Sequence, residues 1–298
     1  MKCSIVILNW NGEKMLKQYL PSVVKYSALP DCEVVVADNG STDNSLTVLK
    51  QEFKSVRIIA LPENYGFAEG YNQALQHIDS EYTVLLNSDV EVTDGWLSPL
   101  ISYLDEHEDV VAAQPKILSW KQRNKFEHAG AAGGYISALG YPYCRGRILW
   151  HTEQDKGQYD TNVQVDWCSG ACMIIRTKAY KDAGGLDARF FAHMEEIDLC
   201  WRLRRQGWKM MCLPESVVYH LGGGSLDYGN PRKTYLNFRN NLIMLQKNLP
   251  PHRWKTLRLV RAILDFAGAI VILCQGHPKG AKAVWQAWKD ARQMMSDN

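Results

Sequence analysis

Residues 82–89 read Tyr-Thr-Val-Leu-Leu-Asn-Ser-Asp, an apolar run that ends in a polar cluster with a carboxylate. The run is rich in aliphatic residues and too short for a helix, so it predicts a buried strand over Tyr82–Leu86. Three similar runs precede it, and segments of helical length separate them. Short apolar strands that alternate with helices predict a mostly parallel sheet covered on both faces. The sequence therefore indicates an α/β fold.

The predicted elements of the first half follow one another closely. We expect strands at Ser4–Leu8, Glu33–Ala37, Val56–Ala60 and Tyr82–Leu86, and helices at Glu13–Tyr26, Asn44–Phe53 and Ala68–His77. Polar residues follow each strand, and ligands of such sheets bind at the carboxyl ends of the strands. The fingerprint GxGxxG is missing after the first strand, which argues against an NAD-dependent enzyme.

The second half is less regular. Lys121–Thr161 predicts long loops, Val163–Arg176 a pair of strands around Ser169-Gly170, Glu195–Gln206 a helix and Met210–Tyr219 a strand. Three helices follow, at Lys233–Asn248, Trp254–Gln275 and Ala281–Met295. We expect one α/β domain over 1–228, with halves 1–100 and 101–228, and a helical C-terminal extension over 229–298.

Composition limits the class of protein. The chain has 298 residues, of which 46% are hydrophobic and 22% charged, as in an ordinary folded domain. The formal net charge of +2 does not single out nucleic acid as a partner. The eight cysteines form no CxxC pair, so we expect reduced thiols in a cytoplasmic protein. No apolar run reaches the ~20 residues of a membrane-spanning helix.

Positive charge is concentrated at the C-terminal end. From Pro250 onwards there are 8 Lys and Arg against 3 Asp and Glu, whereas the preceding residues carry 26 against 29. Trp254–Val271 has apolar residues at helical spacing among basic ones: Leu257, Val260, Ile263, Leu264 and Ala267 with Arg253, Lys255, Arg258 and Arg261. Such a stretch can lie on an anionic membrane surface. Packing against the α/β domain, or against a second copy in a homo-oligomer, explains the pattern equally.

Two residues that end strands are candidates for a metal site. Asp89 places a carboxylate in the expected crevice, where it suits a hard cation that bridges phosphates, although Asp and Asn also form turns there. His220 ends a later strand and precedes three glycines. Beside a carboxylate its imidazole would favour Mn²⁺ over Mg²⁺, but alone a histidine at a strand end is more often structural.

An acidic cluster opens the helix at residue 195. Neighbouring residues on a helix point about 100° apart, so Glu195 and Glu196 cannot share one role, and one of them can face the crevice. Asp198 and Arg202 are four residues apart, which fits a surface ion pair. The acids also complement the helix dipole without any active site.

Seven segments now resemble the family-2 glycosyltransferases, in particular bacterial rhamnosyltransferase-like members. They occur in the family's order and cover roughly residues 1–225: SIVILNWNG, VVVADNGSTDNS, ENYGFAEGYNQAL, LLNSDVEV, SGACMIIR, GGLDARFFAHMEEIDLCWRLRRQGW and VVYHLGGGS. The resemblance implies a GT-A fold, a nucleotide-sugar donor, Mn²⁺ or Mg²⁺, and a glycan or lipid-linked acceptor. The resemblance also implies a role in cell-surface polysaccharide synthesis. The enzyme would be located in the cytoplasm or peripherally on the inner face of the cell membrane.

The resemblance also implies roles for particular residues. The residues that would line the nucleotide pocket are Asn9, Asn11, Asp38, Asn64, Gly66, Asn72 and Asn87. Asp89 matches the last acid of the family's metal-binding Asp-x-Asp, whose first acid is here Asn87. His220 matches the histidine that completes the metal site in some members. Glu196 falls at the catalytic base of a pair usually written Glu-Asp, so Glu195 stays a second candidate. Trp167, Ser169 and Gly170 fall in the acceptor-binding segment.

These roles are consistent with an inverting transfer. A positioned carboxylate takes the proton of the acceptor hydroxyl, and a metal with glycine amides stabilises the diphosphate that leaves. Two alternative functions of the protein remain to be considered. A sugar-phosphate nucleotidyltransferase usually has a Gly-rich basic loop after the first strand, which Asn9–Glu13 lacks. A non-catalytic sugar-binding subunit would not need to retain Asp89, Glu196 and His220 together.

Overall fold

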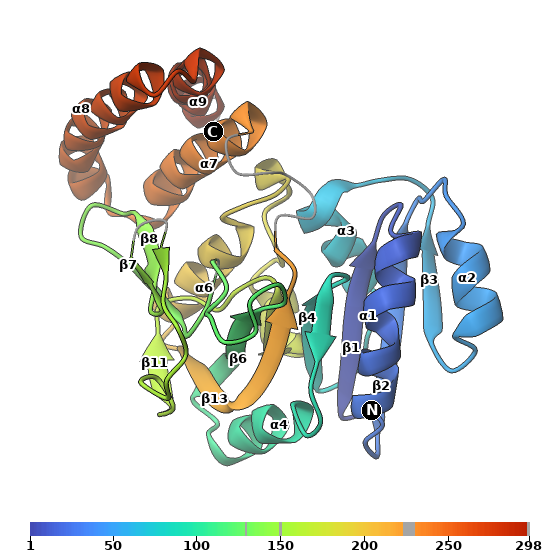
Figure 1. Ribbon diagram of the computed structural model, residues 1–298. Coiled ribbons are helices and arrows are strands. Elements are labelled where there is room, and N and C mark those ends of the chain that lie inside the picture. The colour runs from blue at the N-terminus through green and yellow to red at the C-terminus, as the bar shows by residue number, and fades with distance from the viewer. Residues whose placement is uncertain (129, 149–150, 223–229, 297–298) are drawn as a thin grey trace.

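The computed structural model describes residues 1–128, 130–148, 151–222 and 230–296. Its first half alternates strands and helices as the sequence predicts, with ends that differ by at most two residues (Figure 1). The elements are β1 (Cys3–Asn9), α1 (Glu13–Tyr26), β2 (Cys32–Asn39), α2 (Ser45–Glu52), β3 (Arg57–Leu61), α3 (Gly66–Leu75) and β4 (Tyr82–Asn87).

The second half adds strands that run in both directions. The larger elements are β5 (Val90–Val92), α4 (Leu97–Glu106), β6 (Val110–Ser119), β11 (Val163–Val165), β12 (Cys172–Arg176), α5 (Thr177–Asp182), the 3₁₀ turn Ala188–Phe190, α6 (Glu195–Arg205) and β13 (Lys209–His220). The sequence analysis identified neither α4 nor β6. The predicted loops of 121–161 contain two short antiparallel ribbons, β7 (Gly134–Ile136) with β8 (Pro142–Cys144) and β9 (Arg147–Ile148) with β10 (His151–Thr152).

Among the described residues, one mixed sheet has the order β11-β13-β6-β12-β4-β1-β2-β3, and β5 also pairs with β13. β1, β2, β3 and β4 are parallel neighbours, whereas β12 is antiparallel to both β4 and β6. The prediction that β11 and β12 pair with each other was wrong, because β11 pairs with β13 at the sheet's edge. The carboxyl ends of β1, β2, β3 and β4 therefore lie at one edge of the sheet, whereas the carboxyl end of β12 lies at the opposite edge.

Hydrophobic cores lie on both faces of the sheet. In β1, Ile5 and Ile7 face the core that contains α1, α2 and α4, while Val6 faces the core that contains α3 and α6. This follows from the period of two in a strand, because a strand covered on both faces is apolar throughout. Ser4 and Asn9 are the polar exceptions in this strand and are also buried.

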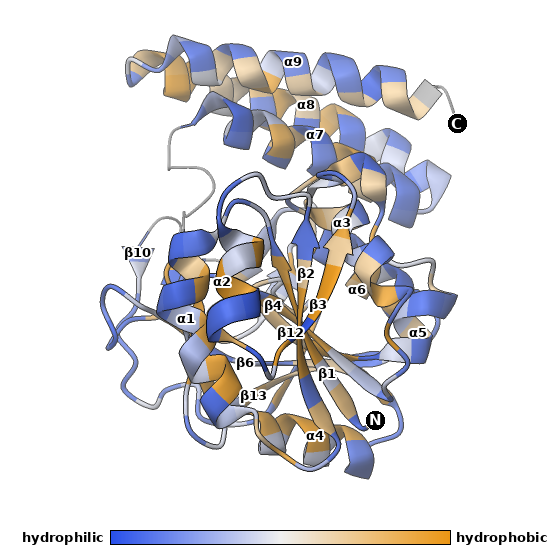
Figure 2. Ribbon diagram, turned by 90° about the vertical axis from the view of Figure 1, so that its right-hand side faces the viewer, coloured by the Kyte–Doolittle hydropathy of each residue, from blue (hydrophilic) through white to orange (hydrophobic). Residues whose placement is uncertain are grey.

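Three C-terminal helices lie together beyond one edge of the α/β layers (Figures 1 and 2). They are α7 (Pro231–Asn248), α8 (Pro251–Cys274) and α9 (Pro278–Ser296). Each begins with proline, whose missing N–H is not needed in the first helical turn. α7 packs against α6 and α9, and α8 packs against α9. The predicted boundary at residue 228 falls in 223–229, outside the described residues.

Candidate active site

Asp89 and His220 meet at one edge of the sheet. Asp89 follows β4, and His220 is the last residue of β13, where it pairs with Val90 of β5. The His220 Nε2 atom lies 3.1 Å from Asp89 Oδ1. The predicted metal site requires Asp89 and His220 to lie next to each other, and in the structure they do.

Glu127 is a third member of this cluster, which the sequence analysis did not identify. Its Oε1 atom lies 3.7 Å from Nδ1 of His220, too far for a hydrogen bond but within the range of an ion pair. Burial lowers the pKa of His220, but Asp89 and Glu127 outweigh it and raise that pKa to about 10. Burial opposes ionisation of Asp89, yet the imidazole beside it holds the pKa of this carboxyl below its usual value. Without a cation the imidazolium balances two carboxylates, and His220 would have to lose a proton to bind a metal.

The donor set fits a divalent cation only in part. A carboxylate oxygen and an imidazole nitrogen are suitable ligands for Mn²⁺, and the buried Nδ1 of His220 has no hydrogen-bond partner. No group of three or more His, Cys, Asp or Glu in the described ranges is arranged to hold a metal. The remaining ligands would therefore come from the diphosphate of a bound substrate or from water. The predicted phosphate-binding glycines 223 and 224 lie outside the described residues.

Asn9, Asn11 and Asp38 form one connected turn region at the ends of β1 and β2. Asn9 Nδ2 donates to Asp38 Oδ1 at 2.9 Å, and both side chains are buried. The Ser41 N–H donates to Asp38 Oδ2, and the Ser41 hydroxyl accepts from the Asn11 N–H. Oδ1 of Asn11 accepts from the Thr42 N–H at 2.7 Å. These bonds fix the crevice wall, and contact with a nucleotide stays a prediction.

Asn64 and Gly66 are joined to the same wall through Asn39. Asn39 Nδ2 donates to Asn64 Oδ1 and to the Gly66 carbonyl. Gly66 has φ +77°, and a Cβ there would lie 2.8 Å from the ring of Phe191. Glycine is required here because the backbone is left-handed and a ring lies against it.

Asn72 lies apart from this wall. Its Oδ1 accepts from the Leu186 N–H and the Tyr180 hydroxyl, and its Nδ2 donates to the Leu186 carbonyl at 2.7 Å. The amide therefore fastens α3 to the segment after α5. Its predicted role in nucleotide binding is not supported by any free polar atom, and the role stays a prediction.

Glu195 and Glu196 form the first turn of α6. Each has an Oε2 atom that is buried without a hydrogen-bond partner. Burial and the adjacent charge of Glu196 raise the pKa of Glu195 well above its usual value. Burial also raises the pKa of Glu196, to about 7, although the Gly170 N–H and other backbone donors moderate the shift. Glu195 is 4% exposed and Glu196 is half-buried, so Glu196 is the more accessible residue, although Oε2 is buried in both.

Gly170 links Glu196 to the strand end that carries Asp89. A Cβ at Gly170 would lie 3.7 Å from the Glu196 side chain. The next residue, Ala171, accepts a hydrogen bond from the Asn87 N–H at 3.0 Å. Asn87 is two residues from Asp89, so the two carboxylates of interest approach the same end of β4.

Trp167 and Ser169 lie inside the protein, at 4% and 3% exposure. The Trp167 indole donates to the Tyr135 carbonyl at 3.0 Å, and the Ser169 N–H donates to the Gln114 side chain. They hold the segment that carries Gly170. Their contact with an acceptor stays a prediction.

The segment before α6 is held in an unusual backbone conformation. Phe191, His193 and Met194 have φ of 64°, 70° and 75°, although none is glycine. Such conformations cost about 1–3 kcal/mol each and persist where surrounding contacts impose them. Here the contacts come from α7. The two N–H donors of the buried Asn240 amide are shared among the carbonyls of Phe190, Ala192 and His193, at N···O distances of 2.8–2.9 Å.

A second connection between α7 and α6 overturns one prediction. Asp198 and Arg202 pair as expected at 2.8 Å, but Asp198 is fully buried rather than on the surface. Asp198 also accepts from Lys247 and Asn248 of α7. The surface prediction was wrong because α7 covers this side of α6. No sequence pattern indicated that Asn240 would meet the segment before α6 or that Asn248 would meet α6, since both lie in an ordinary helical stretch.

Comparisons with known proteins agree with this fold. A model of "Glycosyl transferase family 2" matches residues 4–184, and the chain belongs to this family. It is 25% identical over 232 residues to an N-acetylglucosaminyl-diphospho-decaprenol L-rhamnosyltransferase of Mycobacterium tuberculosis, covering 72% of this chain and 75% of the relative. It is 24% identical over 165 residues to the rhamnosyltransferase WbbL of Escherichia coli, covering 52% of this chain and 61% of WbbL.

A solved structure shows the same fold. It is the mannosyltransferase PcManGT of Pyrobaculum calidifontis in complex with GDP-Man and Mn²⁺. Its TM-score is 0.60 at 14% identity, and the match covers 99% of this chain and 79% of that one. The predicted GT-A fold is confirmed, and so is the resemblance to rhamnosyltransferase-like members of the family. The protein is therefore a family-2 glycosyltransferase.

Proposed function

We propose that this enzyme moves a hexose or rhamnose residue from a nucleoside-diphosphate donor to an acceptor hydroxyl, with inversion, in cell-surface polysaccharide synthesis. The observation that carries the proposal is the approach of Glu196, through Gly170 and Ala171, to the strand end of Asp89 and His220. A base on one side and a diphosphate site on the other are what an in-line displacement requires. Relatives named as rhamnosyltransferases support the sugar class.

Asp89 and His220 are the residues that would hold Mn²⁺ or Mg²⁺ in this proposal. The bound cation would stabilise the negative charge of the departing diphosphate. The presence of Mn²⁺ in the complex of PcManGT supports this choice of metal. The nucleotide would lie along the wall built by Asn9, Asp38 and Asn64.

Glu196 is the proposed base. Its raised pKa, about 7, means that near neutral pH the carboxylate form is populated and is basic enough to accept a hydroxyl proton. Glu195 is more deeply buried, and its burial beside Glu196 raises its pKa, which favours the protonated form next to the base. This division of roles favours Glu196 over Glu195 as the base.

The proposed setting of the enzyme is the inner face of the cell membrane. Among the described residues, no helix is both long and apolar enough to cross a bilayer. Instead α8 exposes aliphatic and aromatic side chains at spacings of three and four residues, which we call the α8 apolar face: Leu259, Val260, Ile263, Leu264, Phe266, Ile270, Val271 and Leu273. Ile263 is 72% exposed and Ile270 62%.

The exposed charged side chains of α8 and α9 are all positive among the described residues. Seven basic side chains of α8 and α9 are exposed: Arg253, Lys255, Arg258, Lys279, Lys282, Lys289 and Arg292. In the described part of these two helices no Asp or Glu is exposed, since Asp265 is buried and Asp290 half-buried. Arg261, predicted to face the surface, is instead 1% exposed and paired with Asp265. Apolar side chains flanked by cations suit an anionic lipid surface, and a second copy of the chain is the competing partner.

The proposed function is tested with Glu196→Gln and a matched control, Glu195→Gln. Sugar transfer and donor binding are measured separately, the second by thermal shift against a panel of nucleotide sugars with Mn²⁺. Glu196→Gln should keep donor binding and lose transfer by about 10²–10⁴-fold, the usual contribution of a general base. Glu195→Gln should retain most of its transfer. Full activity of Glu196→Gln, or equal losses in both variants, would refute the assignment of the base.

A further inference from the structure

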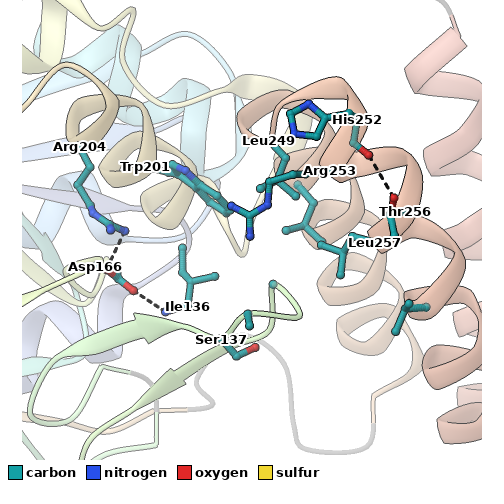
Figure 3. Close-up of a pocket in the computed structure, with 14 residues that line it drawn as sticks. Ile136, Ser137, Asp166, Trp201, Arg204, Leu249, His252, Arg253, Thr256 and Leu257 are labelled. Atoms are coloured by element: carbon teal, nitrogen blue, oxygen red, sulfur yellow. Dashed lines mark hydrogen bonds and ion pairs between the residues drawn. The ribbon is translucent and has the colours of Figure 1, made fainter.

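A cavity of about 530 Å³ lies between α6, the β7–β8 ribbon and the start of α8 (Figure 3). None of the residues proposed for the donor site lines it. Trp201 and Arg204 of α6 form one wall, and Arg253 of α8 extends into the space toward Trp201. The cavity is within the size range of pockets that bind small molecules.

The cavity combines an unpaired cation with a cluster of apolar side chains. Arg204 is neutralised by Asp166 at 2.8 Å. Arg253 is exposed and forms no ion pair or hydrogen bond with its side chain among the described residues. The apolar part of the lining is formed by Ile136, Ala138, Leu245, Leu249, Leu257 and Val260, and its further polar side chains are Ser137, His252 and Thr256. A ligand that satisfies both features carries an anionic group next to a hydrocarbon chain.

The cavity opens next to the α8 apolar face. Val260 belongs to both, because it lines the cavity and is 40% exposed on α8. A hydrocarbon chain that leaves the cavity can therefore continue along exposed aliphatic side chains without crossing a polar surface. This continuity favours a lipid over a free anion of similar charge.

The cavity is also within reach of the proposed base. Asp166 lines it, and Gly170, which contacts Glu196, is four residues further along the chain. Four extended residues span at most about 14 Å. On α6, Trp201 lies about 7.5 Å along the helix axis from Glu196 and about 140° around it, whereas Arg204 lies about 12 Å along the axis and about 80° around it. A sugar attached to a diphosphate bridges a separation of this order.

We propose that this cavity binds the phosphate-bearing head and the first part of the hydrocarbon chain of a lipid-linked acceptor, with Arg253 as the phosphate contact. The inference rests on the proposed function and names its acceptor class as a lipid phosphate or diphosphate. It assigns the α7–α8 side of the molecule to the acceptor and the opposite wall, at β1 and β2, to the donor. The acceptor sugar would then point from the cavity toward Glu196.

The test uses geranyl diphosphate as a water-soluble probe, measured by calorimetry in EDTA. Inorganic diphosphate and geraniol are the two partial probes. The wild type should bind geranyl diphosphate at least about tenfold more tightly than either partial probe, since each lacks one of the two contacts. Arg253→Glu should weaken binding at least about tenfold, the scale of a charge-assisted hydrogen bond, and Arg253→Lys should restore part of it.

Two control variants locate the probe. Lys255→Glu changes the same charge two residues along α8, outside the cavity lining, and should leave binding unchanged. Asp89→Ala alters the donor site and should also leave it unchanged. Equal binding by Arg253→Glu, loss of binding in Asp89→Ala, or equal binding of inorganic diphosphate would overturn the proposal. Probe binding needs no turnover, so a failure of the proposed function appears separately, as absence of sugar transfer by the wild type.

Discussion

Replacing Asn240 by alanine should reduce catalysis more than its cost in stability explains. The amide donates to three carbonyls of the strained segment that leads into Glu195 and Glu196. Each intramolecular hydrogen bond contributes about 0.5–1.5 kcal/mol, so Asn240→Ala should lose about 2–4 kcal/mol of unfolding free energy. For a chain of this size that corresponds to a fall in Tm of roughly 5–15 °C.

The catalytic effect follows from the position of Glu196. Without Asn240, the left-handed residues Phe191, His193 and Met194 can relax, and the first turn of α6 moves with them. A displacement of about 1 Å can cost about 100-fold in rate, so we expect kcat to fall at least about tenfold with little change in donor KM. The acid limb of the pH profile should also shift down, because a less buried Glu196 has a lower pKa.

A variant elsewhere on α7 separates stability from positioning. Tyr235 donates from its hydroxyl to Asp290 of α9 at 2.8 Å. Because the acceptor is a carboxylate, this hydrogen bond contributes about 1.5–3 kcal/mol, and Tyr235→Phe should lose that much stability without touching the segment before α6. Both variants are assayed well below their Tm. If Asn240→Ala keeps wild-type kcat and an unchanged pH profile, α7 only stabilises the fold and the reasoning is refuted.

Three further predictions concern the base, the metal and the membrane. Because the carboxylate form of Glu196 accepts the proton and its pKa is about 7, kcat/KM should rise about tenfold from pH 6 to pH 8; a flat profile down to pH 5 would exclude this base. Asp89→Ala should abolish Mn²⁺-dependent turnover, and a wild-type response to Mn²⁺ would remove Asp89 from the metal site. Ile263→Glu combined with Ile270→Glu should reduce co-sedimentation with phosphatidylglycerol vesicles; unchanged binding together with loss of a dimer in analytical ultracentrifugation would assign the α8 apolar face to a second copy.

The sequence predicts the first half of this fold well, because the pattern there is local. The alternation of Ser4–Leu8, Glu33–Ala37, Val56–Ala60 and Tyr82–Leu86 with helices appears in the structure within a residue or two at each end. The polar residues after these strands form the crevice wall for the same reason, since parallel strands end at one edge. The strands of the second half were harder to assign, because short antiparallel strands such as β11 and β12 take partners far away in the chain.

By itself, then, the sequence determined which residues end strands and which open a helix: Asp89, His220 and the Glu195-Glu196 pair. Only the tertiary structure decided that Asp89 and His220 meet across 131 residues, and that Glu127 joins them. It also decided that Glu196 rather than Glu195 is the more accessible acid, and that Asn240 holds the segment before it. Periodicity reports the face on which a residue lies, whereas sheet order and helix docking fix which distant faces come into contact.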